Sequence, residues 1–101
     1  MAKNYSGGDL SQSDKRKLSG FIREIKKILV ERECTNIELC YGFHFISGFF
    51  TSKNGQIYYI GSSDTRSDFR IYYRTAKSYK DFTGGQNISL NNILDLKTVR
   101  F

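Results

Sequence analysis

The fold class is decided by residues 18–31, which read LSGFIREIKKILVE, and by the change of pattern that follows them. Apolar side chains recur here every three to four residues, which is the period of an amphipathic helix. Upstream, Ser11 followed by Asp14 is a signal for the start of a helix. We therefore expect a helix that begins near Ser11 and buries one apolar face. The positions on that face are Leu18, Phe21, Ile22, Ile25, Ile28 and Leu29.

From residue 37 onward the pattern becomes that of extended strands. Residues 37–50 read IELCYGFHFISGFF and are mostly aromatic or β-branched, which favours a strand. Gly42 and Gly48 suggest a bulge or a bend within that strand. Asn54-Gly55 follows shortly afterwards and predicts a hairpin closed by a type I′ turn.

The second half of the chain is expected to alternate between turns and strands. Residues 61–68 are polar and predict a turn, and residues 69–75 predict a third strand. Residues 77–87 lack periodicity and contain a glycine pair, so we expect a loop. Ser89 is a candidate cap for a short helical turn through Leu94, and residues 96–101 alternate like a last strand.

Taken together, these patterns predict an α+β fold, with an N-terminal amphipathic helix packed on a small antiparallel sheet of three to four strands. A chain of 101 residues suffices for one domain. Residues 1–10 are polar and glycine-containing and predict a flexible lead-in, so the domain is expected over residues 11–101. The chain has no proline and no linker-like tract.

The charge balance limits the classes of partner. Sixteen Lys and Arg residues against ten Asp and Glu residues give a formal net charge of +6, which favours polyanions or acidic protein surfaces. No apolar run suits a signal peptide or a membrane span, so we expect a cytoplasmic protein with no membrane partner. In that compartment Cys34 and Cys40 are expected as reduced thiols.

A basic and aromatic segment over residues 66–80 is the main candidate binding surface. Period-two alternation places Arg70, Tyr72 and Arg74 on one face of the third strand. Guanidinium groups pair with phosphate and aromatic rings stack on bases, so such a face suits nucleic acid or a nucleotide. The alternative is a solvated strand face whose charges oppose aggregation. The residues assigned to this surface are Arg66, Arg70, Tyr72, Arg74, Lys77, Tyr79 and Lys80.

Two further features are candidate binding sites. Thr83, Gly84 and Gly85 form a candidate anion-binding loop, because successive backbone N–H groups can surround an anion; an ordinary turn is the alternative. The predicted helix also carries a basic surface that suits phosphate groups or an acidic protein, and a solvated helix face is the alternative. The cations of that surface are Lys15, Arg16, Arg23, Lys26 and Lys27.

The sequence offers no recognisable catalytic or metal-binding motif. His44 is the only histidine, and without an identifiable oriented partner it is more simply structural than catalytic. Cys34, Cys40 and His44 lack the paired spacing of structural zinc sites. We therefore predict no catalytic residues, no metal and no cofactor.

Residues 74–77 (RTAK) and 80–85 (KDFTGG) resemble a segment of small proteins encoded by phages and mobile elements of low-GC bacteria. Such proteins include anti-CRISPR and other anti-defence inhibitors, which commonly bind a host complex rather than catalyse a reaction. The resemblance implies a similar role and assigns no site residues.

The resulting functional hypothesis is a non-enzymatic binding protein, an anti-CRISPR-like inhibitor of a bacterial defence complex from a phage or mobile element. It is expected to act through the basic, tyrosine-rich surface of residues 66–80. Its expected partner is a host protein or ribonucleoprotein complex. The alternatives left open are a small nucleic-acid- or nucleotide-binding protein and, less favoured, a metal-independent nuclease. The oligomeric state is not predicted by the sequence.

Overall fold

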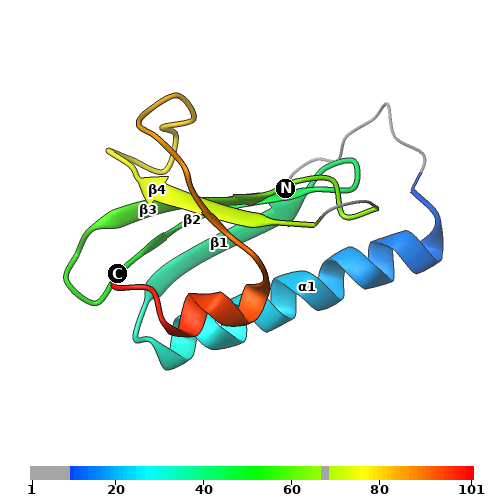
Figure 1. Cartoon of the computed structure of the whole chain (residues 1–101), viewed down its shortest axis with the longest axis horizontal. Helices are drawn as coiled ribbons and strands as arrows, with labels where there is room; N and C mark the ends of the chain where they lie inside the picture. Colours follow the sequence, from blue (N-terminus) through cyan, green and yellow to red (C-terminus); the bar gives the residue numbers. More distant parts are fainter. Residues whose placement is uncertain (1–9, 67–68) are drawn as a thin grey trace.

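The computed structural model describes residues 10–66 and 69–101 and confirms the α+β fold (Figure 1). A single long helix packs against one face of an antiparallel sheet, and no helix of the described residues covers the other face. The sheet has five strands, so the expectation of three to four was too low. The predicted lead-in over residues 1–10 lies outside the described residues, apart from Leu10.

Helix α1 (Gln12–Glu31) begins where the sequence predicted. Ser11 is its N-cap, and the Ser11 hydroxyl accepts a hydrogen bond of 3.0 Å from the backbone N–H of Asp14. This bond satisfies one of the backbone donors that have no partner in the first helical turn. The face toward the sheet buries Leu18, Ile25 and Leu29 almost completely. The amphipathic period therefore determined both the length of the helix and its orientation.

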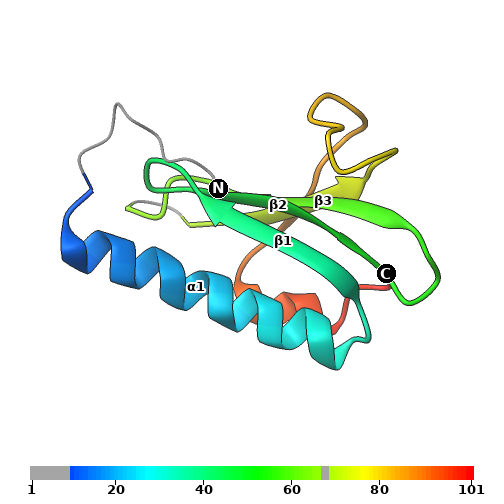
Figure 2. The ribbon, with the colours of Figure 1, turned by 180° about the vertical axis from the view of Figure 1, so that it is seen from behind.

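The five strands form a simple meander in which each strand pairs with the next one along the chain. Strand β1 and strand β5 are therefore the two edges of the sheet, and β1 lies on the side of the molecule that faces the viewer in Figure 2. The strands are β1 (Thr35–Tyr41), β2 (Ile46–Thr51), β3 (Ile57–Ser62), β4 (Ile71–Thr75) and β5 (Ile88–Leu90).

The single strand predicted over residues 37–50 was wrong, because the chain reverses direction within it. The backbone N–H of Gly42 donates to the carbonyl of Phe45 at 2.9 Å and closes a hairpin between β1 and β2. His44 adopts a φ of 61°, in the left-handed region, to make this reversal. Aromatic residues fill the turn, so the polar and glycine-rich composition that usually marks a turn is missing.

The hairpin between β2 and β3 was predicted correctly, although its turn is longer than expected. Thr51 pairs with Ile57, and the connection spans residues 52–56. The backbone N–H of Ser52 donates to the carbonyl of Gln56 at 2.8 Å. Gly55 has a φ of 90°, whereas Asn54 is not among the positive-φ residues, which excludes a type I′ turn.

The C-terminal segment differs from its prediction in two ways. Ser89 lies in β5 rather than at a helix start, and the short helix is the 3₁₀ helix η1 (Ile93–Lys97). Its first turn is held by Asp95, whose carboxylate accepts hydrogen bonds from the backbone N–H groups of Asn91 (3.1 Å) and Asn92 (3.3 Å). The predicted last strand over residues 96–101 is absent, because Leu96 and Val99 are buried against the core instead.

The alternation of side chains across the strands resolves which tyrosines belong to the core. Tyr58 and Tyr73 point toward α1, where both contact the ring of Phe101. Tyr59 and Tyr72 point to the face without a helix, which we call the open face. In the described part of the chain, no helix combines the length and the apolar content that crossing a membrane requires.

Candidate functional site

The open face of the sheet is partly covered by the loop that follows β4. Phe49 of β2 and Tyr59 of β3 are paired neighbours on this face. The ring of Phe82 lies edge-on to Phe49, with centroids 5.1 Å apart, and the ring of Tyr79 lies 5.7 Å from Phe49. Residues 76–87 therefore form a lid of aromatic side chains over the center of the open face.

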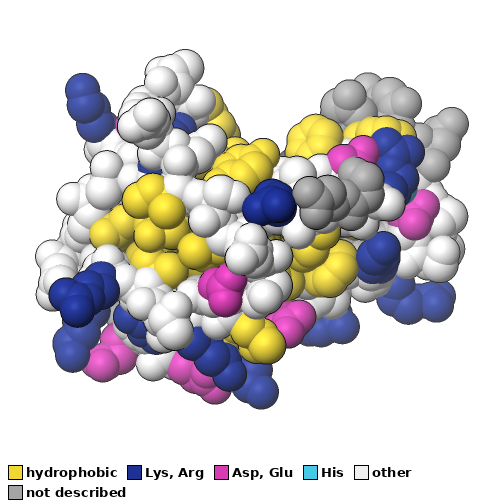
Figure 3. Space-filling view, viewed as in Figure 1, with side chains coloured by type: hydrophobic (Ala, Val, Ile, Leu, Met, Phe, Trp, Pro, Cys, Tyr) yellow, Lys and Arg dark blue, Asp and Glu magenta, His cyan; other side chains and the backbone are white. Residues whose placement is uncertain are grey.

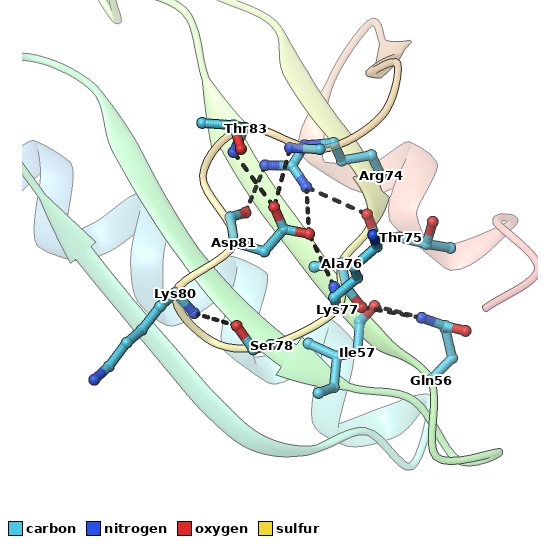
Figure 4. A network of polar contacts seen from close by, with 11 residues as sticks. Gln56, Ile57, Arg74, Thr75, Ala76, Lys77, Ser78, Lys80, Asp81 and Thr83 are labelled. Carbon is cyan, nitrogen blue, oxygen red and sulfur yellow. Dashed lines mark hydrogen bonds and ion pairs between the residues drawn. The ribbon is translucent and has the colours of Figure 1, made fainter.

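Arg74 anchors this loop and is not exposed to a ligand (Figure 4). Only 6% of Arg74 is accessible to solvent, and its guanidinium lies 4.7 Å from the center of the Tyr59 ring. The guanidinium donates a hydrogen bond of 2.7 Å to the carbonyl of Asp81 and lies 3.8 Å from the Asp81 carboxylate. The prediction that Arg74 belongs to an accessible basic surface was therefore wrong, because its charge is used within the fold.

The candidate anion-binding loop already surrounds an anion from the chain itself. The Asp81 carboxylate accepts hydrogen bonds from the backbone N–H groups of Lys77 (2.9 Å), Gly84 (3.0 Å) and Thr83 (3.4 Å). The first of these bonds makes the largest contribution to lowering the pKa of Asp81 from its ordinary value. Gly85 adds a φ of 64° to the turn. The N–H groups that a phosphate would need are therefore taken by Asp81.

The two tyrosines assigned to the basic surface are held by hydrogen bonds to the protein. The Tyr79 hydroxyl donates to the carbonyl of Asn36 at 2.8 Å and lies 2.7 Å from the Thr51 hydroxyl. The Tyr72 hydroxyl donates to the carbonyl of Ser62 at 3.0 Å. Both rings are half-buried. These contacts fix the tyrosines as parts of the open face rather than as free stacking groups.

The remaining basic residues of the predicted surface are divided between the two ends of β4. Arg66 and Arg70 lie in the connection between β3 and β4, and Lys77 and Lys80 follow β4. The five residues of β4 separate these pairs by about 16 Å. Arg66 also pairs with Asp64 at 2.6 Å, and its guanidinium lies 4.8 Å from the Phe43 ring. The structure therefore does not assemble the seven predicted residues into one surface.

Electrostatics around Arg66 further indicate a local structural role. Two hydrogen bonds join its guanidinium to the two carboxylate oxygens of Asp64, and its backbone N–H makes a third. The side-chain hydrogen bond from Arg66 is the largest contribution to holding the pKa of Asp64 well below its ordinary value. The same bond raises the pKa of Arg66. Arg66 therefore closes the turn that begins at Asp64.

A different basic surface is present on α1. Six of its cations are exposed, and at 100° per residue five of them fall within one arc of about 120° that contains no carboxylate. No ion pair joins any of them to a carboxylate within residues 10–66 and 69–101. We call this arc the basic flank; its members are Lys15, Arg16, Arg23, Lys26 and Lys27.

Lys15 and Lys26 of the basic flank lie on the β1 side of the helix at 100° per residue, whereas Arg16, Arg23 and Lys27 project away from the sheet. Lys27 also lines a hollow with Leu94 and Lys97 at η1. On the side away from β1, Phe21 and Glu24 line a hollow together with Ile93 of η1, so that side of α1 faces η1. Figure 3 shows that acidic and basic side chains are mixed along the helix on the η1 side. In Figure 2, which shows the molecule from behind, β1 runs beside α1. The sequence indicated these five cations, but only the fold turns two of them, Lys15 and Lys26, toward an edge strand.

A shallow groove adjoins the same edge on the open face. Its volume is about 320 Å³, and it lies between β1, β2 and the aromatic lid. Cys40 is exposed beside this groove as a free thiol. The side chains that line it on the open face are Glu38, Cys40, Ser47, Phe49, Tyr79 and Phe82.

Metal-binding side chains and the single histidine were the sequence's candidates for chemistry. No group of three or more His, Cys, Asp and Glu side chains within residues 10–66 and 69–101 is placed to hold a metal ion. His44 is 5% exposed, and its ring lies edge-on to Phe43 at 4.3 Å. Its carbonyl accepts a hydrogen bond from the backbone N–H of Thr65. These contacts agree with a structural role for His44.

No protein family, curated protein or solved structure matches this chain.

Proposed function

We propose that this chain is a non-enzymatic binding protein that inhibits a bacterial defence complex, and that it contacts an acidic surface of that complex through the basic flank of α1. The observation that carries the proposal is the row of five exposed cations without a carboxylate among them. A helix that only needed solubility would tolerate mixed charges, as the η1 side of α1 has. A row of side chains that are all positively charged instead attracts an anionic partner and accelerates its association.

The likeness of residues 74–77 and 80–85 to small phage-encoded proteins supports the inhibitor class. Inhibitors of this class act on nucleic-acid-guided complexes inside the bacterial cell, so the proposal places the chain in the cytoplasm. Binding alone suffices for such a role, which agrees with a surface that offers exposed charge.

Nucleic acid is the second candidate partner, because the same five cations would attract phosphate groups. Sequence-tolerant binding of single strands also uses aromatic rings on which bases stack. Tyr72 and Tyr79 lie on the open face, on the opposite side of the sheet from α1, and hydrogen bonds hold both hydroxyls. The basic flank itself contains no aromatic residue. This separation of charge from aromatic rings favours an acidic protein surface.

The test uses two double variants that change the net charge equally. Arg23→Glu with Lys26→Glu reverses the basic flank, whereas Lys77→Glu with Lys80→Glu reverses the loop that the sequence favoured. Each tagged protein is used to capture partners from a bacterial lysate, with and without nuclease, and is then added to a cleavage assay of the captured complex. We expect wild type and the loop variant to capture a nuclease-resistant complex and block its cleavage activity, and the flank variant to do neither.

Three results would count against the proposal. Equal capture by the flank variant would remove α1 from the interface. Recovery of nucleic acid alone, released by moderate salt, would support the second candidate instead. Capture without any effect on cleavage would exclude inhibition of that complex.

A further inference from the structure

Strand β1 ends the sheet with backbone groups that have no strand beside them. In an antiparallel pair, alternate residues direct their N–H and C=O groups toward the partner strand. The backbone N–H of Gly42 donates to Phe45, so Cys40, two residues earlier, also faces β2. Leu39 and Tyr41 therefore direct their backbone groups away from the sheet. In the part of the chain that the structure describes, no other segment bonds to these groups.

The first part of β1 is protected against strand pairing, whereas the second part is not. The register with β2 shifts between Thr35 and Glu38, and Asn36 has a φ of 49°. Such a bulge disturbs an edge and prevents regular pairing. The Tyr79 hydroxyl also occupies the carbonyl of Asn36. Beyond the bulge, the register from Glu38 to Tyr41 is regular.

The two sides of this open edge differ in chemistry. The side toward α1 carries the half-buried side chains of Leu39 and Tyr41. Helix α1 runs beside β1 on this side (Figure 2), and its helical period turns Lys15 and Lys26 of the basic flank toward β1. The other side carries Glu38 and Cys40 and opens into the groove that Phe82 borders. Side chains of an added strand would alternate between these two sides. Acidic residues would be favoured at every second position, where they meet the basic flank, and small or apolar residues at the positions between.

A second copy of this chain is a poor occupant of the edge. Pairing β1 with β1 of another copy would bring two basic flanks to the same junction. Like charges placed opposite each other across strands are destabilising. The charge of the flank therefore selects an acidic partner and opposes self-association.

We propose that the open edge of β1, from Glu38 to Tyr41, accepts an extended acidic segment of the partner protein as a sixth strand. Backbone hydrogen bonds to Leu39 and Tyr41 provide the pairing, as in other cases of strand addition. The basic flank selects acidic residues on the helix side of that segment. This inference rests on the proposed function, because it gives the acidic surface a conformation and a site.

The experiment uses a blocked eight-residue peptide that alternates Glu and Val, with a Lys–Val peptide of the same pattern as its control. Amide hydrogen exchange of the isotope-labelled protein is followed by NMR with each peptide. We expect saturating Glu–Val peptide to slow exchange at Leu39 and Tyr41 by about tenfold or more, because both amides become hydrogen-bonded. The Lys–Val peptide should leave both amides unchanged.

Charge and pairing are separated by three variants. Lys26→Glu on the basic flank should weaken the Glu–Val peptide by about tenfold, whereas Lys97→Glu on η1, with the same change of net charge, should have little effect. Leu39→Pro removes the outward N–H without taking a bond from β2 and should prevent binding. If Leu39→Pro does not fold, amide hydrogen exchange at Leu39 and Tyr41 in the wild-type protein still decides whether the peptide pairs with β1.

Several results would overturn the inference. Protection by both peptides alike would remove the basis for charge selection. Protection at Ile88 to Leu90 would place the added strand on β5, and shifts confined to α1 would show charge attraction without pairing. Protection of Leu39 and Tyr41 that rises with protein concentration alone would assign the edge to a second copy. The proposed function is tested separately, by capture and cleavage assays with the Arg23→Glu and Lys26→Glu double variant. Failure of the strand-addition inference is therefore distinguishable from failure of the proposed function.

Discussion

Arg74→Met provides a direct test of the conclusion that Arg74 is a structural anchor. Methionine retains much of the aliphatic volume of arginine but loses the guanidinium. The variant gives up a charged hydrogen bond of 2.7 Å to the Asp81 carbonyl and a ring contact with Tyr59 at 4.7 Å. A hydrogen bond from a charged donor contributes about 2 kcal/mol and a buried cation–π contact about 1 kcal/mol. We therefore expect the free energy of unfolding to fall by about 3 kcal/mol.

For a chain of this size, a loss of about 3 kcal/mol lowers the midpoint of thermal unfolding by roughly 12–24 °C. Circular dichroism melting and urea unfolding measure both quantities. Lys77→Met is the matched control, because it removes one exposed cation from the same loop and should change stability by less than about 0.5 kcal/mol. If Arg74→Met unfolds like wild type but binds an acidic target more weakly, the anchoring role is refuted and the original assignment of Arg74 to a binding surface is restored.

Three further predictions concern the Asp81 carboxylate, the two cysteines and the close approach of β1 and β2. Because the pKa of Asp81 is lowered in the folded protein, its ionised form stabilises the fold at pH values above the ordinary pKa of 3.8, and this stability is lost as the pH falls through the lower folded pKa. The free energy of unfolding, followed from pH 6 to pH 2, should therefore be less acid-sensitive in Asp81→Asn than in wild type. The same pH dependence in both proteins would contradict the role of the carboxylate. Burial, opposed in part by Arg32, raises the pKa of the Cys34 thiol, whereas Cys40 is exposed. A thiol reagent should therefore modify one cysteine rapidly in the native protein and none rapidly in Cys40→Ser, and two rapid reactions in wild type would be incompatible with this fold. Gly48→Ala would drive the new Cβ into the backbone of β1 at Glu38 and should lower the free energy of unfolding by about 3 kcal/mol. Gly20→Ala, whose Cβ meets only the Arg23 side chain, should instead raise it by about 0.5–1 kcal/mol. Equal stabilities of the two variants in urea unfolding would refute the close approach of β1 and β2.

Much of the fold was predictable because its signals are local. The helical period of residues 18–29 and the cap at Ser11 depend only on neighbours within a few positions, and the structure confirmed both. The hairpin around Asn54-Gly55 was also recognised, since residues on both sides have strand composition. The reversal at residues 42–45 was missed because aromatic residues form it, and β5 was missed because three residues carry too little pattern.

The candidate site was less predictable, because composition does not reveal which charges are already paired. Arg74 and Asp81 are seven residues apart along an irregular loop, so no periodicity indicates their contact. The predicted surface therefore counted Arg74 as exposed and overlooked Asp81. The cations of α1 follow a regular period, and their position on one arc could be read from the sequence.

By itself, the sequence determined an amphipathic helix, strands rich in aromatic residues, and an excess of positive charge. These follow from the side-chain period and from the counts of charged residues, which need no partner elsewhere in the chain. The tertiary structure decided which of these charges remain free. Folding buries Arg74 against Tyr59, fills the glycine loop with the Asp81 carboxylate, and makes β1 an edge beside the basic flank. Each of these outcomes depends on contacts between residues brought together only by strand order and loop closure, and so no local pattern could express them.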